Sequence, residues 1–583
     1  MEKRKFALGI DFGTNSVRPV IVDVDSGEEV ASFVHEYTRG KDGIIEKQGD
    51  PNFARQNPVE YVEGLEASVK GAIEAASDQA DVADNIIGIG IDTTGSTPLP
   101  VDGSGQPLSF TKKFRDNPNA MAWLWKDHTG FAEAAQFTEQ AKREPTDYTR
   151  YCGGTYSSEW FFSKVLHLAR VDPEVFSAAA SFVEHCDYMP ALLVGETDPS
   201  KIIRSRCAAG HKAMFNAEWG GLPPQDFLSR VDPKLDGIIS RLYKESHTAD
   251  ARVGGLCPEW AKKLGLKEGI AVAAGTFDAH AGAVGAGIRE GTLVKIMGTS
   301  TCDMMIVPPA SLNVAIKGIC GQVDGSIVPG YIGLEAGQSA VGDIYAWFRD
   351  EVRWPLENIL PRTSFGPDLT AEKISALMRE SKDTVYDVLS EKGAKLRPGQ
   401  SGLLALDWHN GNRTILVDPN LSGLIVGLNL QTRPEEIFRA LIEATAFGSR
   451  VIMDRICEYG FSINDIITCG GLAEKNPYLM QIYADVTGRP IKVSRSAQTC
   501  ALGMAMFAAV AAGYYDRVED AQKTMGGLKD TVYQPNPENI AIYDRLFKLY
   551  RRLHDAFGTT DFAENHFFVM KELLEIKRQT TRA

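Results

Sequence analysis

One short phrase occurs twice in this chain of 583 residues, and it constrains the fold more than any other feature. Residues 8–16 read Leu-Gly-Ile-Asp-Phe-Gly-Thr-Asn-Ser, and residues 294–300 read Val-Lys-Ile-Met-Gly-Thr-Ser. Each phrase is an apolar run typical of a β-strand that ends at Gly-Thr in a tight turn, where glycine allows consecutive N–H groups to surround a phosphate oxygen. Because about half of the chain separates the two turns, we expect two similarly built lobes that each bind phosphate.

The composition indicates a large soluble protein with more than one domain. At roughly 150 residues per domain, the length suggests two to four domains, and 44% apolar with 24% charged residues is sufficient for packed cores. No run approaches the roughly 18 uncharged apolar residues of a membrane helix. The basic start, Met-Glu-Lys-Arg-Lys, passes into a strand rather than an export signal. We therefore expect a cytoplasmic protein that does not bind membranes.

The net charge, the cysteine content and the absence of two common nucleotide-binding motifs argue against several classes of protein. The net charge of −14 disfavours non-specific binding of nucleic acid. Nine cysteines occur singly and form no C-x-x-C pair, which argues against a disulfide framework and against a zinc site. The G-x-x-x-x-G-K-[ST] phrase is absent, and no G-x-G-x-x-G opens a helix after a strand. A phosphate site must therefore be built from the hairpin turns themselves.

Strand-like and helix-like segments alternate along the chain, as in α/β domains. In the predicted helix at 432–459, Thr432 is expected to be the N-cap together with Glu435, and Gly460 the stop. The Gly-rich segment 281–288 lies between the two halves and is predicted to form a hinge or crossover, which divides the chain into residues 1–288 and 289–583. Other strands are predicted at 86–91, 270–274, 293–297 and 466–469, and other helices at 58–76, 158–167 and 565–582.

Four phrases occur in the order found in FGGY carbohydrate kinases, which this chain resembles from about residue 6 to residue 515. The resemblance implies the α/β, two-lobed ATPase fold of actin, hexokinase and Hsp70, with duplicated ribonuclease H-like domains. It implies an N-terminal sugar-binding lobe (1–288), a C-terminal nucleotide-binding lobe (289–583) with a helical extension, and ATP and Mg2+ as cofactors. The phrases are Asp-Phe-Gly-Thr-Asn-Ser-Val-Arg at 11–18, Thr-Phe-Asp-Ala-His at 276–280, Ile-Met-Gly-Thr-Ser at 296–300 and Cys-Gly-Gly-Leu-Ala-Glu-Lys-Asn at 469–476.

Five further phrases resemble the family members that phosphorylate L-ribulose at its terminal hydroxyl, giving L-ribulose 5-phosphate and ADP in L-arabinose catabolism. They lie at residues 92–98, 117–121, 124–129, 209–213 and 335–341. Other members typically carry Gln-Met-His or a similar triplet in place of residues 93–96 and Trp-Asn/Asp-Asp-x-Arg in place of 125–129, which counts against xylulose and glycerol as substrates. A kinase for another ketopentose or pentitol, such as D-ribulose or ribitol, is an alternative, and so is a nucleotide-switched ATPase.

Asp278 is the residue that we expect to act in catalysis. Phosphoryl transfer to a sugar hydroxyl needs a carboxylate that accepts the hydroxyl proton, and Asp278 follows the strand at 270–274 at its carboxyl end. Without the family resemblance, Asp278 could equally be a helix N-cap. Asp11 ends the first strand, where its carboxylate can hold Mg2+, although Asp in this phrase can also simply begin a β-turn. Pro19 in the return strand predicts an irregular hairpin.

The resemblance assigns the remaining site residues in three groups. Lys212 could equally be a surface lysine, whereas Glu335 lies among small residues and requires a ligand or a basic partner. The expected partners are a small ketopentose and ATP, and a homodimer is compatible with the sequence. Around the ketose the resemblance places Thr93, Thr94, Gly95, Ser96, Trp125, Asp127, Lys212, Asp278 and Glu335. Around the phosphates it places Gly13, Thr14, Asn15, Ser16, Arg18, Gly298, Thr299 and Ser300, and around the adenosine Gly470, Gly471 and Asn476.

Overall fold

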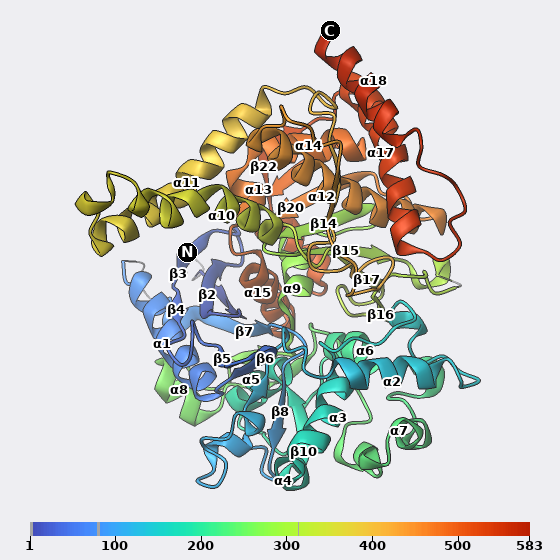
Figure 1. The fold of residues 1–583 in the computed structure, drawn as a ribbon. Coiled ribbons are helices and arrows are strands. Elements are labelled where there is room, and N and C mark those ends of the chain that lie inside the picture. The colour runs from blue at the N-terminus through green and yellow to red at the C-terminus, as the bar shows by residue number, and fades with distance from the viewer. Residues whose placement is uncertain (1–3, 79–81, 313, 583) are drawn as a thin grey trace. The chain divides into compact units, whose positions relative to one another are not determined.

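The computed structural model of the protein describes residues 4–78, 82–312 and 314–582 (Figure 1). These residues form two compact units. Unit 1 comprises the chain up to Val294, Met304–Glu335 and Ser494–Leu528, and unit 2 comprises Lys295–Asp303, Ala336–Val493 and the chain from Lys529 onward. The units are discontinuous in sequence, so the predicted division of the chain at residue 288 into a sugar lobe and a nucleotide lobe stays a prediction.

The main sheet of unit 1 has the strand order β11-β12-β7-β1-β2-β3, with β13 paired to β7 and β4 paired to β2. Its strands are β1 (Phe6–Phe12), β2 (Ser16–Asp23), β3 (Glu29–Ser32), β4 (His35–Glu36), β7 (Ile86–Thr93), β11 (Arg252–Gly255), β12 (Ala271–Ala273) and β13 (Thr276–Phe277). Smaller sheets of unit 1 join β5 (Ile45–Lys47), β6 (Asp50–Gln56) and β9 (Ala122–Trp123), and β8 (Pro98–Val101) with β10 (Ser181–Glu184). The antiparallel pair β16 (Gly321–Asp324) and β17 (Ile332–Ala336) belongs to unit 1 up to Glu335.

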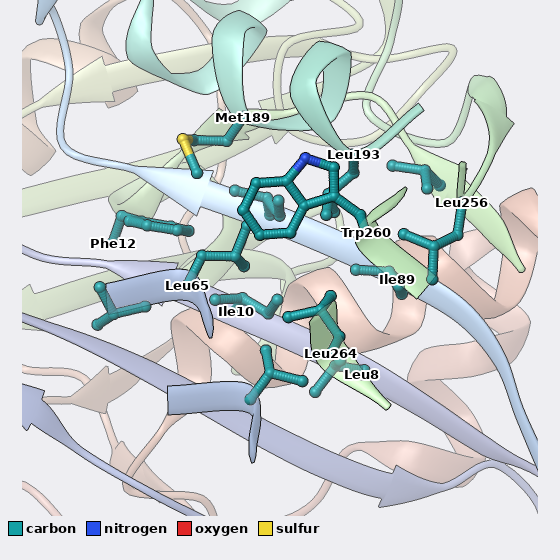
Figure 2. Packing of buried hydrophobic residues seen from close by; sticks show 14 of the residues in the cluster. Leu8, Ile10, Phe12, Leu65, Ile89, Met189, Leu193, Leu256, Trp260 and Leu264 are labelled. Carbon is teal, nitrogen blue, oxygen red and sulfur yellow. The ribbon is translucent and has the colours of Figure 1, made fainter. Parts of the chain in front are cut away.

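One face of this sheet is apolar and packs against helices α1 (Val59–Ala75), α5 (His185–Val194) and α8 (Pro258–Leu264). Side chains alternate along a strand, so Leu8, Ile10 and Phe12 of β1 point to the same face. Figure 2 shows them around the indole of Trp260, together with Leu65, Ile89, Met189, Leu193, Leu256 and Leu264. Complete burial of each such side chain stabilises the fold by about 1.5–3 kcal/mol. The helices of unit 1 are α1 (Val59–Ala75), α2 (Phe131–Ala141), α3 (Phe161–Val171), α4 (Pro173–Ala178), α5 (His185–Val194), α6 (Arg206–Ala213), α7 (Gln225–Val231), α8 (Pro258–Leu264), α9 (Asp278–Gly285), α15 (Thr499–Ala511) and α16 (Val518–Met525).

The other face of β1 and β7 carries glycine, which allows α15 to lie directly against the strands. A Cβ atom on Gly9 would come within 1.7 Å of the carbonyl oxygen of Ala501, and one on Gly90 within 2.2 Å of that of Met504. Any side chain at either glycine would therefore displace α15 from the sheet.

The Gly-rich segment at 281–288 is not a hinge or crossover, and that prediction is wrong. Most of it belongs to α9, which packs closely on α15 within unit 1. A Cβ atom on Gly285 would lie 2.0 Å from the carbonyl oxygen of Thr499, and one on Gly503 would lie 2.0 Å from that of Ala281. The small residues permit close contact between two helices rather than motion.

The hairpin that contains Pro19 is regular, contrary to expectation. The register of β1 and β2 is continuous and includes the pair Ile10 and Pro19. On the other side of β2, β4 pairs with Ser16 and Val17, and β3 pairs from Val20 onward. Pro19 therefore falls between two edge strands, where no ladder partner requires its missing N–H.

The helix predicted at 432–459 is α12 (Pro434–Glu458), and its cap lies one residue later than predicted. The N–H of Arg433 donates to Glu436 Oε2 at 2.8 Å, whereas the Thr432 hydroxyl accepts from a preceding loop N–H at 3.0 Å. Gly460, with φ of +89°, follows the helix end as predicted. The predicted C-terminal helix is also confirmed, as α18 (Val569–Arg582).

Unit 2 contains the sheet run β14-β20-β21-β22, in which β20 and β21 are parallel. The strands are β14 (Thr292–Met297), β15 (Thr301–Val307), β18 (Leu404–Leu406), β19 (Leu424–Val426), β20 (Asp465–Cys469), β21 (Ile491–Ser494) and β22 (Leu528–Tyr533). The unit division cuts β14, β15, β21 and β22. The helices besides α12 and α18 are α10 (Gly342–Asn358), α11 (Ala371–Ala394), α13 (Gly471–Lys475), α14 (Pro477–Thr487) and α17 (Pro537–Gly558). Within the described residues, every helix is too short or too polar to span a membrane.

Candidate active site

The carboxyl ends of the central strands in unit 1 bring three carboxyl groups to one edge of the sheet. In the strand register, Asp11 of β1 lies opposite Asp92 of β7 on one side and opposite Arg18 of β2 on the other. Strand β13 pairs in parallel with the end of β7, and Asp278 follows directly as the first residue of α9. The predicted residues Asp11, Arg18 and Asp278 are therefore neighbours at an edge where α/β sheets commonly bind ligands.

Asp92 is the member of this group that sequence reasoning missed. Its side chain is 0% exposed, and neither carboxyl oxygen receives a hydrogen bond from a described residue. Burial, followed by the charges of Asp11 and Asp278, raises the pKa of Asp92 well above its usual range. A second repeat could have revealed it, because Leu-Gly-Ile-Asp at 8–11 is matched by Ile-Gly-Ile-Asp at 89–92.

Asp278 is half-buried, and its environment suits proton transfer. Its Oδ1 accepts a hydrogen bond of 2.7 Å from the N–H of Ala279, while Phe277 occupies the N-cap position that was the alternative for Asp278. Burial, followed by the charge of Asp11, raises the pKa of Asp278 to about 7. A carboxylate with a pKa near neutrality can accept a hydroxyl proton and release it again.

The first Gly-Thr turn is a tight hairpin that places an arginine beside Asp11. The N–H of Gly13 donates to the carbonyl oxygen of Ser16 at 3.0 Å. Arg18 Nη2 lies 3.0 Å from Asp11 Oδ2, and a Cβ atom on Gly13 would come within 2.6 Å of the same nitrogen. A side chain at position 13 would therefore have to displace the end of the Arg18 side chain.

Other segments of unit 1 hold the two residues at the tip of this turn. Trp125 donates from Nε1 to Thr14 Oγ1 at 3.0 Å, and Asn15 donates from Nδ2 to the carbonyl oxygen of Asp42 at 2.7 Å. The structure thus brings together Trp125, predicted for the sugar, and Thr14, predicted for the phosphates. The bond orients the indole, and an apolar ring face is a common wall of a sugar site.

Two buried charged residues that sequence reasoning missed hold the predicted sugar loop, residues 93–96. Lys164 of α3 donates from Nζ to the carbonyl oxygens of Ser96 at 2.7 Å and Leu124 at 2.8 Å. Glu184 of β10 accepts from Ser96 Oγ and, at 2.7 Å, from the next backbone N–H. Burial lowers the pKa of Lys164 to about 8 and raises that of Glu184 to about 7. Their hydrogen bonds offset this burial and fix the loop.

Asp127 is completely buried, and neighbouring groups engage its carboxylate. Its Oδ2 accepts from the N–H of Ala54 at 2.8 Å and from the Arg55 guanidinium, while Oδ1 accepts from the Thr129 hydroxyl at 2.5 Å. Asp127 therefore ties β6 to the segment that carries Trp125. The structure assigns it this supporting role, and its contact with a sugar stays a prediction.

Lys212 and Glu335 form a buried ion pair between α6 and β17. Lys212 is 6% exposed, so the surface-lysine alternative is wrong, and its Nζ lies 2.8 Å from Oε1 and 3.2 Å from Oε2 of Glu335. Although burial favours the neutral acid, the charge of Lys212 holds the pKa of Glu335 well below its usual range. After burial and Asp11, the charge of Glu335 also raises the pKa of Asp278. The partner expected for Glu335 is therefore this lysine.

In unit 2, the second Gly-Thr turn is the tip of the β14–β15 hairpin. The N–H of Gly298 donates to the carbonyl oxygen of Ser300 at 3.0 Å, and the carbonyl oxygen of Thr299 accepts from a loop N–H at 2.8 Å. At its base, Lys295 Nζ is buried 2.7 Å from Asp303. Because these two charges neutralise each other, the predicted role of the turn in phosphate binding rests on its backbone.

The residues predicted for the adenosine lie at the ends of β20, α13 and α14 in unit 2. Gly470 has φ of +95°, and a Cβ atom there would lie 2.5 Å from the carbonyl oxygen of Met297, so this position requires glycine. Gly471 begins α13, and Asn476 caps α14, its Oδ1 accepting from the N–H of Leu479 at 3.0 Å. The Asn476 amide nitrogen remains a donor, and its contact with adenine stays a prediction.

The carboxyl edge in unit 1 offers ligands of the kind that Mg2+ prefers. Asp11 Oδ1 and both Asp92 oxygens are buried and receive no hydrogen bond within the described part of the chain. Magnesium binds through oxygen atoms, commonly one or two carboxylates with substrate phosphates. The residues therefore fit the predicted ion, with Asp11 as the predicted ligand and Asp92 and Asp278 as its neighbours.

Comparisons with known proteins identify the family of this chain. Residues 6–285 match the N-terminal domain and residues 293–512 the C-terminal domain of the FGGY family of carbohydrate kinases. A Ribulokinase of Vibrio parahaemolyticus is 44% identical over 94% of this chain and 95% of its own length, and one of Halalkalibacterium halodurans is 42% identical over 95% of each.

Solved structures confirm the predicted α/β fold. A xylulose kinase from Rhodospirillum rubrum has a TM-score of 0.74 at 21% identity, covering 95% of this chain and 99% of that one. A Plasmodium falciparum glycerol kinase with ADP has a TM-score of 0.71 at 16% identity, covering 95% and 98%. The chain therefore belongs to the FGGY family of carbohydrate kinases.

Proposed function

We propose that this protein is an ATP-dependent L-ribulose kinase, which phosphorylates the terminal hydroxyl and yields L-ribulose 5-phosphate and ADP. The observation that carries the proposal is Asp278, a carboxylate with a pKa raised to about 7 beside Asp11 and within the field of the Lys212–Glu335 pair. Two relatives named Ribulokinase, 44% and 42% identical over nearly the whole chain, support the choice of sugar. A cytoplasmic role in L-arabinose catabolism goes with this substrate.

In this proposal, Asp278 accepts the proton of the attacking hydroxyl as the new O–P bond forms. Lys212 and Glu335 supply a donor and an acceptor for the ketose hydroxyls, and the loop at 93–96, fixed by its buried partners, sets the shape of the site. Correct placement of the hydroxyl against the carboxylate contributes a large share of the rate. Asp11, with Asp92 nearby, would hold Mg2+, which would supply positive charge for the phosphates.

The catalytic part of the proposal is tested by Asp278→Asn, which keeps the shape of the side chain but removes the base. We expect kcat to fall by about 10²- to 10⁴-fold, with ATP affinity nearly unchanged. Asp226→Asn is the matched control, because Asp226 is exposed on α7. Turnover of Asp278→Asn close to that of the control would remove Asp278 from the mechanism.

The substrate is tested by ADP release measured with each 2-ketopentose and pentitol. We expect the highest kcat/KM with L-ribulose. A higher value with D-ribulose or ribitol would reject L-ribulose and retain the kinase class, and ADP release indifferent to every sugar would indicate a nucleotide-switched ATPase instead.

A further inference from the structure

A second cluster of metal-binding side chains lies in unit 1, apart from the carboxyl groups described above. Cys207 and His211 are four residues apart on α6 and therefore share one helix face. His280 joins them from α9, and one ligand atom of each of the three lies within 4.8 Å of the others. All three side chains are buried, at 2%, 0% and 2% exposure.

The imidazoles in this cluster have unused polar atoms. Neither ring nitrogen of His280 has a hydrogen-bond partner among the described residues, and His211 Nδ1 has only an ion-pair contact with Glu335. His211 Nε2 is bonded to Ser326 Oγ at 2.9 Å, which fixes the ring and directs Nδ1 away from this bond. Leaving a buried polar atom unpaired costs about 1–3 kcal/mol, so a role in packing alone does not explain His280, which has no hydrogen bond at either ring nitrogen within the described residues. A bound cation would satisfy them.

Glu335 provides a fourth donor at the same place. Its Oε2 lies 3.2 Å from His211 Nδ1 and 3.6 Å from His280 Nε2. Nitrogen and oxygen ligands of a tetrahedral zinc ion, at about 2.0–2.1 Å from the metal, are about 3.3 Å apart. The distance from Oε2 to His211 Nδ1 therefore matches this spacing, and the distance to His280 Nε2 is slightly longer. Lys212 lies closer to Oε1, at 2.8 Å, than to Oε2.

We propose that Cys207, His211, His280 and Glu335 form a site for a thiophilic divalent cation, of which Zn2+ is the representative. One thiolate, two imidazoles and one carboxylate suit Zn2+ and its analogue Co2+, whereas Mg2+ prefers an all-oxygen set. The site is therefore chemically distinct from the carboxyl edge at Asp11. Coordination requires neutral imidazoles and a Cys207 thiol that has given up its proton.

A cation in this site would compete with the sugar for Glu335, an inference that rests on the proposed function. Glu335 is the predicted acceptor for the ketose, and an ion held at Oε2 engages that carboxylate. Zn2+ and L-ribulose then compete, so the cation acts as an inhibitor that raises the apparent KM for the sugar and leaves kcat unchanged. At free Zn2+ tenfold above its Kd, we expect a rise of about tenfold in KM.

Metal binding is tested on the full-length protein independently of kinase activity. We expect equilibrium dialysis to show one Zn2+ bound through this site, and Co2+ to give a thiolate-to-cobalt charge-transfer absorption. Cys207→Ser should abolish that absorption and weaken Zn2+ binding by at least about tenfold, and His280→Asn should weaken binding similarly. Cys186→Ser is the matched control, since Cys186 is a buried thiol of the same small apolar cluster but not one of the ligands. Zn2+ binding that is absent, or unchanged in Cys207→Ser and His280→Asn, would overturn the proposal.

The competition is tested by sugar kinetics at excess Mg2+ with and without Zn2+. We expect a Zn2+-dependent rise in KM for L-ribulose that persists in Cys186→Ser and disappears in Cys207→Ser. If Cys207-dependent Zn2+ binding occurs but KM does not change, the competition is rejected while the metal site stands. If the protein binds Zn2+ in this way but phosphorylates none of the sugars, the proposed function fails instead.

Discussion

Removal of the lysine from the buried Lys212–Glu335 pair tests whether this pair is the electrostatic centre of the predicted sugar site. Lys212→Met keeps the length of the side chain and removes its charge. At 2.8 Å and an effective dielectric constant of about 20, the attraction that is lost is about 6 kcal/mol. Part of this attraction only offsets the desolvation of the two charges. Removing one partner of a buried ion pair typically lowers the free energy of unfolding by about 3–5 kcal/mol. We expect a loss of unfolding free energy in this range.

The assay is a double-mutant cycle of urea unfolding with Lys212→Met, Glu335→Gln and the double variant. Because the cost arises from the unpaired carboxylate, the double variant should be more stable than Lys212→Met. Lys70→Met is the matched control, since the Lys70–Glu66 pair is exposed on α1, with 53% and 39% of the two side chains accessible. Such pairs contribute about 0.3–0.5 kcal/mol. A loss in Lys212→Met no larger than that in Lys70→Met, or strict additivity in the cycle, would refute this reasoning.

Three further changes test the fold and the metal edge. Gly9→Ala should destabilise the protein by about 1–3 kcal/mol or more in urea unfolding, because its Cβ would lie 1.7 Å from the carbonyl oxygen of Ala501, whereas Gly103→Ala, with open space around it, should not. Burial lowers the pKa of His185 to about 3 in the folded protein, whereas its pKa in the unfolded chain is 6.5. The free energy of unfolding therefore falls as the pH drops below 6.5, by about 1.4 kcal/mol at pH 5.5. His185→Phe should reduce this loss of unfolding free energy between pH 7.5 and 5.5. An unchanged pH dependence in this variant would contradict the lowered pKa of His185. Asp92→Asn should raise the Mg2+ concentration for half-maximal activity about 10- to 100-fold without lowering stability, and an unchanged Mg2+ requirement would exclude Asp92 from the metal edge.

Much of the site in unit 1 could be predicted because short phrases at strand ends determine it. Asp11 and Asp278 each follow an apolar run, and parallel strands deliver such residues to the same edge. The geometry of the first Gly-Thr turn could also be predicted, because a tight hairpin at glycine depends only on residues that are adjacent in the sequence. Asp92 obeys the same rule, but no Gly-Thr turn follows it as one follows Asp11, so only the shorter Gly-Ile-Asp match indicates it.

The Gly-rich segment at 281–288 shows where local patterns mislead. Glycine and alanine in a row are compatible with a hinge, with a loop and with a closely packed helix. What decides among these is the partner, α15, which begins at Thr499 and is remote in sequence. The same limit applies to the cysteine count, because a ligand set drawn from α6, α9 and β17 has no C-x-x-C spacing to reveal it.

The support of the sugar loop required information that the sequence does not carry. A lysine in a helix is usually solvent-exposed. The apolar neighbours of Lys164, Phe161, Phe162, Val165 and Leu166, favour its burial but do not identify its partners. Its burial is favourable only because backbone carbonyl oxygens of Ser96 and Leu124 converge on its Nζ, and each of these is more than thirty residues away. Glu184 binds the other side of the same loop, so the two charges stabilise one loop conformation between them. Because either charge alone would be buried without its counterpart, the shape of the predicted sugar site depends on both together.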